Sequence, residues 1–138
     1  MTLAALEVTL RQRLLGELLP VNRMLTVSAD ELRRRAGYLQ VRLAERGIEC
    51  ERIAGVSAAG GGSLPGHELP TILLALPGHA SRLAAALRRG HPPVLARIEE
   101  DRCCIDLRTV LRGQDDQLQL AIEAAMPAVS EGRGDAGR

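Results

Sequence analysis

The stretch TILLALPGHASRLAAALRRGHPPVLARIEEDRCCIDLR, residues 71–108, decides the fold. Its first six residues form an apolar run between two prolines, which is typical of a strand buried on both faces. Residues 80–89 carry leucine and alanine at helical spacing and end before a glycine, and residues 94–99 return to a strand pattern. This order predicts a strand, helix and strand unit, and we expect its two strands to pair in parallel through a right-handed crossover.

Two further strands are predicted beside this unit. A tight turn at Glu100 and Asp101 joins residues 94–99 to a hairpin partner at residues 103–108. A weak alternation of apolar and polar side chains over residues 48–56 indicates another strand before the unit. Because strands and helices mix along the chain, we predict an α+β fold in which helices cover a mixed β-sheet.

Helical patterns flank these strands in the sequence. Residues 2–19 carry leucines at spacings of three and four. Ser28 and Glu31 form a capping box for a helix that ends at Gly47, and an aspartate at 115–116 can begin a last helix. The last nine residues hold no apolar side chain larger than alanine, which predicts a disordered tail. We therefore divide the chain into an N-terminal helix with its connection, a small α+β domain and the tail: residues 1–27, 28–129 and 130–138.

The composition limits the core and the overall charge. Phe and Trp are absent from the 138 residues and Tyr38 is the one aromatic residue, so the core must be packed from leucine, valine, isoleucine and alanine. Eighteen basic residues are balanced by 17 acidic ones, and the net charge is +1. This balance gives no long-range field that attracts phosphate, which disfavours nucleic-acid binding by this segment alone.

The cysteines and the N-terminus indicate a compartment. Cys50, Cys103 and Cys104 are odd in number and form no C-x-x-C spacing, which suits a reducing environment better than a disulfide framework. Adjacent cysteines in a strand point to opposite faces, so we interpret Cys103 and Cys104 as packing residues. No targeting pattern opens the chain, and no run approaches the ~18 apolar residues of a membrane span. We expect a soluble, cytoplasmic protein with no membrane partner.

Five segments of the chain resemble one known family. They follow one another along the sequence: Thr2–Arg11, Gly60–Pro65, Leu69–Pro70, Pro92–Ile98 and Ile105–Val110. In that order and at those spacings they resemble the C-terminal part of bacterial selenocysteine synthase, the L-seryl-tRNA(Sec) selenium transferase that uses pyridoxal phosphate (PLP). The resemblance covers about residues 2–126.

This resemblance implies a fold, a reaction and a set of partners. The fold is the C-terminal small domain of fold-type I PLP-dependent transferases. The reaction, in the complete enzyme, converts seryl-tRNA(Sec) to selenocysteinyl-tRNA(Sec) with selenophosphate, in selenocysteine biosynthesis. The implied cofactor of the complete enzyme is PLP. The implied partners are a PLP-binding large domain, in the same or a separate chain, seryl-tRNA(Sec), and further copies of the complete enzyme in a homo-oligomer.

The basic residues limit what this chain does by itself. All eighteen are arginine and none is lysine. PLP enzymes of this type hold the cofactor covalently on a lysine amine, and a guanidinium cannot replace that amine because it stays protonated and is not nucleophilic. We therefore expect the chain to be the C-terminal portion of such a transferase, inactive alone, with no catalytic residue of its own and no cofactor bound to it alone.

Arg108 and the glycine-rich loop are the candidate substrate-binding residues. The resemblance implies that Arg108, at the end of a predicted strand, forks onto the carboxylate of a seryl group, as guanidinium geometry allows. The alternative is that Arg108 pairs with Asp106 or caps a neighbouring helix. Gly61, Gly62 and Ser63 offer backbone N–H groups and a hydroxyl that suit an anion, although a flexible linker has the same composition.

The remaining polar residues do not suggest a catalytic or metal site. Arg97 lies in mid-strand, where we interpret it as solvated or interface-forming. His67, His79 and His91 stand beside glycine or proline with no cysteine or carboxylate at ligand spacing, so we expect no metal. Two other functions stay open: a stand-alone binding or regulatory module that docks on a separate PLP-binding domain, and part of a related PLP enzyme that acts on free amino acids.

Overall fold

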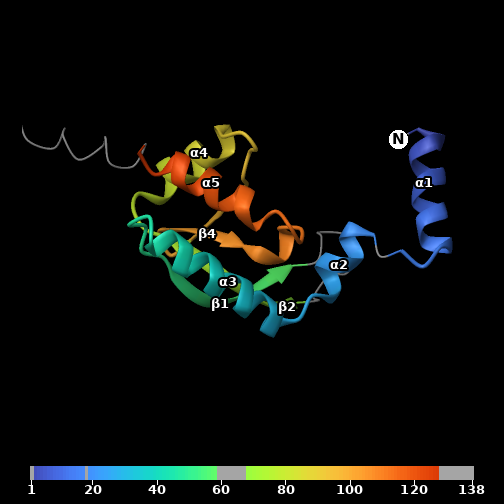
Figure 1. Ribbon diagram of the computed structural model, residues 1–138, viewed down its shortest axis with the longest axis horizontal. Helices are drawn as coiled ribbons and strands as arrows, with labels where there is room; N and C mark the ends of the chain where they lie inside the picture. The colour runs from blue at the N-terminus through green and yellow to red at the C-terminus, as the bar shows by residue number, and fades with distance from the viewer. Residues whose placement is uncertain (1, 18, 59–67, 128–138) are drawn as a thin grey trace, which may run out of the picture.

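The computed structural model describes residues 2–17, 19–58 and 68–127, and it shows a sheet and helix body with one helix projecting at the N-terminal end (Figure 1). The predicted loop at Gly60–Pro65 and the predicted tail at 130–138 lie outside the described residues. The elements follow in the order α1 (Leu3–Leu14), α2 (Pro20–Thr26), α3 (Ala29–Ala44), β1 (Glu51–Ala58), β2 (Glu68–Leu76), α4 (Ala80–Arg89), β3 (Arg97–Glu99), β4 (Arg102–Asp106), the 3-10 helix η1 (Leu107–Thr109) and α5 (Asp115–Ala125).

The described strands form one antiparallel sheet in the order β1-β2-β4-β3. This confirms the predicted α+β class, but the expected parallel pairing of β2 with β3 is wrong. Glu100 and Asp101 adopt φ of 48° and 58°, the left-handed conformation that two-residue hairpin turns require. The turn folds β4 back along β3, and the other edge of β4 pairs with β2. The strands β2 and β3 therefore run in the same direction with β4 between them.

Helices cover one face of this sheet, and the main core lies between the two layers (Figure 1). Helix α3 packs on β2, α4 packs on β4, and α5 packs on both helices. Ile72 and Leu74 point into this core, whereas Leu73 and Ala75 point to the opposite face and form a smaller cluster with Cys104. The prediction that this strand is buried on both faces is confirmed.

Aliphatic side chains and cysteines fill the core, as the composition requires. Tyr38 is exposed on the surface of α3, while the three cysteines are buried. Cys103 belongs to the core under the helices and Cys104 to the cluster on the opposite face, which confirms that these neighbours point in opposite directions and serve as packing residues.

The predicted capping box forms in part. The Oγ atom of Ser28 accepts a hydrogen bond from the backbone N–H of Glu31 at 3.2 Å, and α3 begins at the next residue, Ala29. The carboxylate of Glu31 accepts from Arg112, a residue 81 positions further along the chain. A tertiary ion pair has therefore replaced the second bond of the box.

Two helices form within residues 1–27, where one helix over residues 2–19 and a connection were predicted. Helix α1 ends at Leu14, Gly16 turns the chain with φ of 73°, and α2 begins at Pro20, whose fixed φ suits a first helical position. No residue of α1 is buried, and Leu3 and Leu14 are 85% and 89% exposed. Figure 1 shows α1 far from the sheet. Among the described helices, none combines the length and the apolar character needed to cross a bilayer.

Candidate arginine-lined site

Asp106 organises the end of β4, where the site begins. Its carboxylate accepts a hydrogen bond from the backbone N–H of Arg108 at 3.0 Å and so caps the η1 turn. The same carboxylate accepts from the hydroxyl of Thr71 on β2 at 2.7 Å and from the hydroxyl of Ser57 on β1. Two strands and the turn are thus tied to one side chain, which fixes the direction in which Arg108 leaves the sheet.

The guanidinium of Arg108 is buried against backbone carbonyls. Only 6% of the residue is exposed. Its Nη1 donates to the carbonyl oxygens of Met24 and Val27 at 2.9 and 3.1 Å, and its Nη2 donates to that of Pro70 at 2.7 Å. A cation at the C-terminal end of α2 also complements the helix dipole. Arg108 therefore holds α2 against β2, in agreement with the helix-capping alternative. Its Nε is buried and has no hydrogen-bond partner among the residues that the structure describes.

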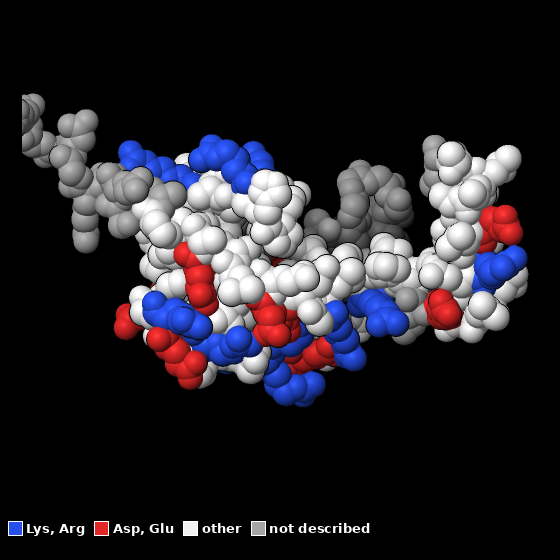
Figure 2. Space-filling view, turned by 45° about the horizontal axis from the view of Figure 1, so that its top comes forward, with Lys and Arg blue, Asp and Glu red and all other residues white. Residues whose placement is uncertain are grey.

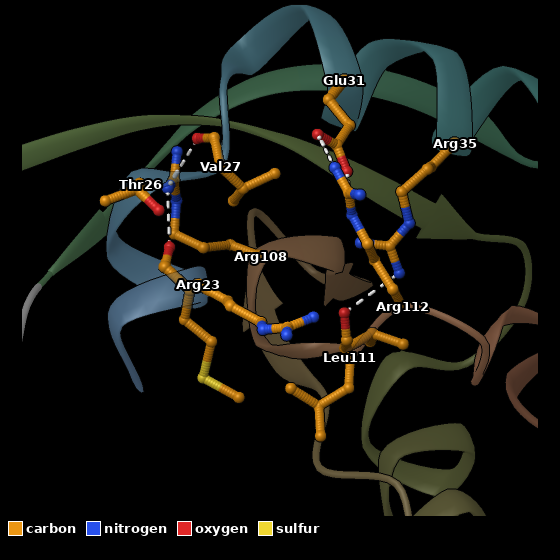
Figure 3. A pocket seen from close by; sticks show the side chains of 10 residues that line it. Arg23, Thr26, Val27, Glu31, Arg35, Arg108, Leu111 and Arg112 are labelled. Atoms are coloured by element: carbon orange, nitrogen blue, oxygen red, sulfur yellow. Dashed lines mark hydrogen bonds and ion pairs between the residues drawn. The ribbon is translucent and has the colours of Figure 1, made fainter. Parts of the chain in front are cut away.

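A surface pocket of about 280 Å³ adjoins Arg108 between α2, the first turns of α3 and the segment after η1 (Figure 3). Its described lining contains four arginines, from four different parts of the chain: Arg23, Arg35, Arg108 and Arg112. Figure 3 shows Arg23 extending across the pocket from α2 toward Leu111, and Arg35 beside Arg112 on the opposite wall. A pocket of this composition suits a small anion.

Two of these arginines are held by carboxylates. Arg35 forks onto Asp115, with Nε and Nη2 at 3.1 and 2.6 Å from the two oxygens, and also donates to the carbonyl oxygens of Leu107 and Val110. Arg112 forks onto Glu31 at 2.9 and 2.6 Å. The hydrogen bonds from Arg112 lower the pKa of Glu31, against the opposing effect of its burial. Both forks hold rigid cations at the pocket wall.

The described lining of the pocket offers binding groups, and its one hydroxyl, that of Thr26, donates to the carbonyl oxygen of Asn22 at 2.8 Å. Among its described lining residues there is no lysine, histidine or cysteine, and its one carboxylate, Glu31, has a lowered pKa that makes it a weak base. The described residues also contain no cluster of three side chains able to hold a metal ion. The chemistry available here is recognition of an anionic or strongly polar group.

The other predicted site residues lie elsewhere. Gly61, Gly62 and Ser63 fall outside the described residues, so their role stays a prediction. Arg97 lies on the sheet face without helices, with its Nε 3.0 Å from Glu99 and its Nη1 donating to the carbonyl oxygen of Val56 at 2.9 Å. It is not part of the pocket around Arg108.

Sequence reasoning missed three arginines of the pocket, Arg23, Arg35 and Arg112, and it missed helix α2, which lines one side of the pocket. Arg35 follows Glu31 by four positions, a spacing that places both side chains on one face of α3. This spacing can be read from the sequence. No local pattern, however, indicates that Arg112 contacts Glu31 or that Asp115 contacts Arg35. Helix α2 is only seven residues long and buries no side chain, so no apolar stripe marks it.

Taken together, the described residues form an α+β domain with a helix-covered antiparallel sheet, an arginine-lined pocket and an exposed leucine-bearing helix. The family model described as SelA, L-seryl-tRNA selenium transferase, matches residues 1–111. The chain belongs to this family.

Individual relatives agree with the family match. The chain is 38% identical to the L-seryl-tRNA(Sec) selenium transferase of Moorella thermoacetica over 143 residues, which cover 96% of this chain and 30% of the relative. It is 43% identical over 136 residues to the transferase of Geobacter sulfurreducens, covering 90% of the chain and 28% of the relative. The chain thus spans less than a third of the length of the curated relatives that it matches.

Proposed function

We propose that this chain is the C-terminal portion of an L-seryl-tRNA(Sec) selenium transferase and acts in selenocysteine biosynthesis together with a PLP-binding large domain. The observation that carries the proposal is the family match over residues 1–111, with relatives that cover nearly all of this chain while the chain covers under a third of them. In the proposed complete enzyme, selenophosphate supplies selenium and seryl-tRNA(Sec) becomes selenocysteinyl-tRNA(Sec). The exposed leucines of α1 support a docking role toward a larger partner.

The residues of this chain do not fit covalent attachment of PLP. The sequence contains no lysine, and the arginine-lined pocket holds no other amine side chain. The cofactor would have to be held by the part of the enzyme that this chain does not span. The contribution proposed for this chain is therefore structural and recognitional.

The contacts of Arg108 help to distinguish seryl-tRNA from a free amino acid as the substrate. In an aminoacyl-tRNA the carboxyl group is an ester of the ribose, so it offers a carbonyl oxygen and no carboxylate to fork onto. A carboxylate contact by Arg108 would fit a free amino acid, the substrate of the alternative enzyme class. Because three backbone carbonyls occupy its Nη atoms, the arrangement favours a positioning role for Arg108 in a transferase that acts on seryl-tRNA.

A chimaera tests the proposed function. The matching segment of the Geobacter sulfurreducens transferase would be replaced by this chain, and selenium incorporation into seryl-tRNA(Sec) and into free serine would be measured. We expect transfer to seryl-tRNA(Sec) by the chimaera, and none by the transferase lacking the segment or by this chain alone. Restored activity when the chain is added as a separate protein would support the docking module. A folded chimaera that is inactive, or active only on free serine, would contradict the proposal.

A further inference from the structure

The outer face of α4 carries an arginine cluster that the pocket does not use. Four residues of α4 are buried against the core, namely Ala80, Leu83, Ala84 and Leu87. Arg82, Arg88 and Arg89 are exposed. We name these three residues the α4 arginine face. Arg89 follows Arg82 by seven positions, which corresponds to about 10.5 Å along the helix axis and nearly two full turns.

The charges of this face are not balanced by carboxylates. Helix α4 has no acidic residue, and the thirty residues between Glu68 and Glu99 contain none. Arg82, Arg88 and Arg89 form no ion pair or hydrogen bond with any described residue. Figure 2 shows basic side chains gathered over α4 with no acidic side chain among them, whereas basic and acidic side chains alternate over the lower part of the molecule.

Several arginines elsewhere on the surface are paired with carboxylates. On α3, Arg33 pairs with Asp30, Arg35 with Asp115 and Arg42 with Asp116. The net charge of +1 therefore averages a balanced region with a cationic one, and the sequence-based argument against phosphate binding does not apply to α4 locally.

We propose that the α4 arginine face binds the phosphate backbone of an RNA. The inference rests on the proposed function in one respect, since that function supplies a tRNA as the RNA. Guanidinium groups stay charged at every physiological pH and match phosphate oxygens bidentately, and the two turns between Arg82 and Arg89 span more than one contact point. Such contacts position a nucleic acid without reading its sequence.

The chemistry of the face favours RNA over a membrane. Helices that lie on membranes place leucine or aromatic side chains beside their cations. On the helix surface, the side chains of Ser81 and Ala85 lie between those of the arginines. They are too small or too polar to insert among lipid chains. An RNA backbone requires only the charges and the donors.

The direct test measures binding of a fluorescein-labelled tRNA(Sec) transcript to the 138-residue chain by anisotropy at several salt concentrations. One variant combines Arg82→Gln, Arg88→Gln and Arg89→Gln. The control removes the same charge from α3 and its end with three other substitutions: Arg33→Gln, Arg34→Gln and Arg46→Gln. We expect the α4 variant to lose roughly tenfold or more in affinity and to lower the slope of log K against log salt by about 2 to 3, as three phosphate contacts predict, with the control within about threefold of the native chain.

Other outcomes overturn the inference. Equal losses in both variants would mean that only net charge matters, and unchanged binding in the α4 variant would remove its role. Equal or tighter binding to phosphatidylcholine–phosphatidylserine vesicles or to polyglutamate would assign the face to a membrane or an acidic protein. In the chimaera, the α4 variant should raise KM for seryl-tRNA(Sec) and leave kcat unchanged. If the chimaera is inactive the proposed function fails, and the binding experiment still decides the α4 arginine face.

Discussion

The bridge made by Arg108 gives a prediction whose size follows from its contacts. Replacing Arg108 by Gln removes three hydrogen bonds that a charged donor makes to the carbonyls of Met24, Val27 and Pro70. Hydrogen bonds from charged groups contribute about 1.5–3 kcal/mol each, but the carbonyls of Met24 and Val27 end a helix without buried residues, where water can replace the donor. If the bond to Pro70 contributes its full value and the bonds to Met24 and Val27 contribute in part, the free energy of unfolding should fall by about 2–4 kcal/mol.

Urea unfolding measures this loss. With a dependence of about 2 kcal/mol per molar urea, the midpoint should fall by about 1–2 M. The urea midpoint of Arg108→Lys should lie between those of the native chain and Arg108→Gln. An ammonium group keeps the charge, but it cannot contact α2 and β2 together as a planar guanidinium does. Arg97→Gln is the comparison variant. Its guanidinium donates to one carbonyl and pairs with Glu99 and Asp106 at a partly exposed site, so its loss should be smaller, about 1–2 kcal/mol.

Hydrogen exchange locates the same effect. The amides of α2 should exchange faster in Arg108→Gln than in the native chain, while those of α4 keep their protection. Equal unfolding midpoints for the native chain and Arg108→Gln, with unchanged exchange in α2, would refute the bridging role. If that variant nevertheless lost activity in the chimaera, the guanidinium would belong to a ligand.

Three further predictions concern the thiols, the pocket ion pair and the core. Burial, and then the neighbouring Cys104, raise the pKa of Cys103 to about 11, so the three buried thiols should react slowly with a disulfide reagent at pH 8 and rapidly in denaturant; fast labelling of the native chain would contradict this. Because Arg112 lowers the pKa of Glu31 in the folded chain, the pair stabilises the fold above the ordinary carboxyl pKa and loses that effect as pH falls, so the urea midpoints of native chain and Arg112→Gln should converge between pH 6 and pH 3. A difference between the two urea midpoints that stays constant with pH would show that Arg112 acts through packing. Leu74→Ala should cost about 2–5 kcal/mol because the side chain is fully buried in β2, whereas calorimetry of the exposed Leu95→Ala should show almost no change.

Local patterns predicted most of the elements and little of their pairing. The cap at Ser28, the doubly buried run around Leu74 and the turn at Glu100 are encoded by neighbouring residues, so sequence reasoning found them. The position of β4 between β2 and β3 depends on a choice between partners far apart in the chain, and the strand, helix and strand order suggested a parallel pair that the hairpin displaces.

The sequence predicted Arg108 as a site residue, but it did not predict the residues that Arg108 contacts. Arg108 was singled out, and the structure places it beside a pocket. What it touches could not be derived, because α2 has no apolar stripe and lies 84 residues from its partner. The same limit applies to Arg35 and Arg112, whose carboxylates are 80 and 81 positions away. Nor could a count of charges show that three of the four α3 arginines form ion pairs, whereas the three of α4 form none with the described residues.

Asp106 gives the molecule a mechanical property. Its carboxylate accepts hydrogen bonds from the hydroxyls of Ser57 and Thr71 and from the backbone N–H of Arg108 in η1, so β1, β2 and the turn share one anchor. Loss of this one carboxylate would remove all three hydrogen bonds, and Arg108, which it positions, is the residue that holds α2, a helix with no buried residue of its own. The sheet face without helices and the pocket wall on α2 are therefore joined by one continuous chain of hydrogen bonds through Asp106 and Arg108.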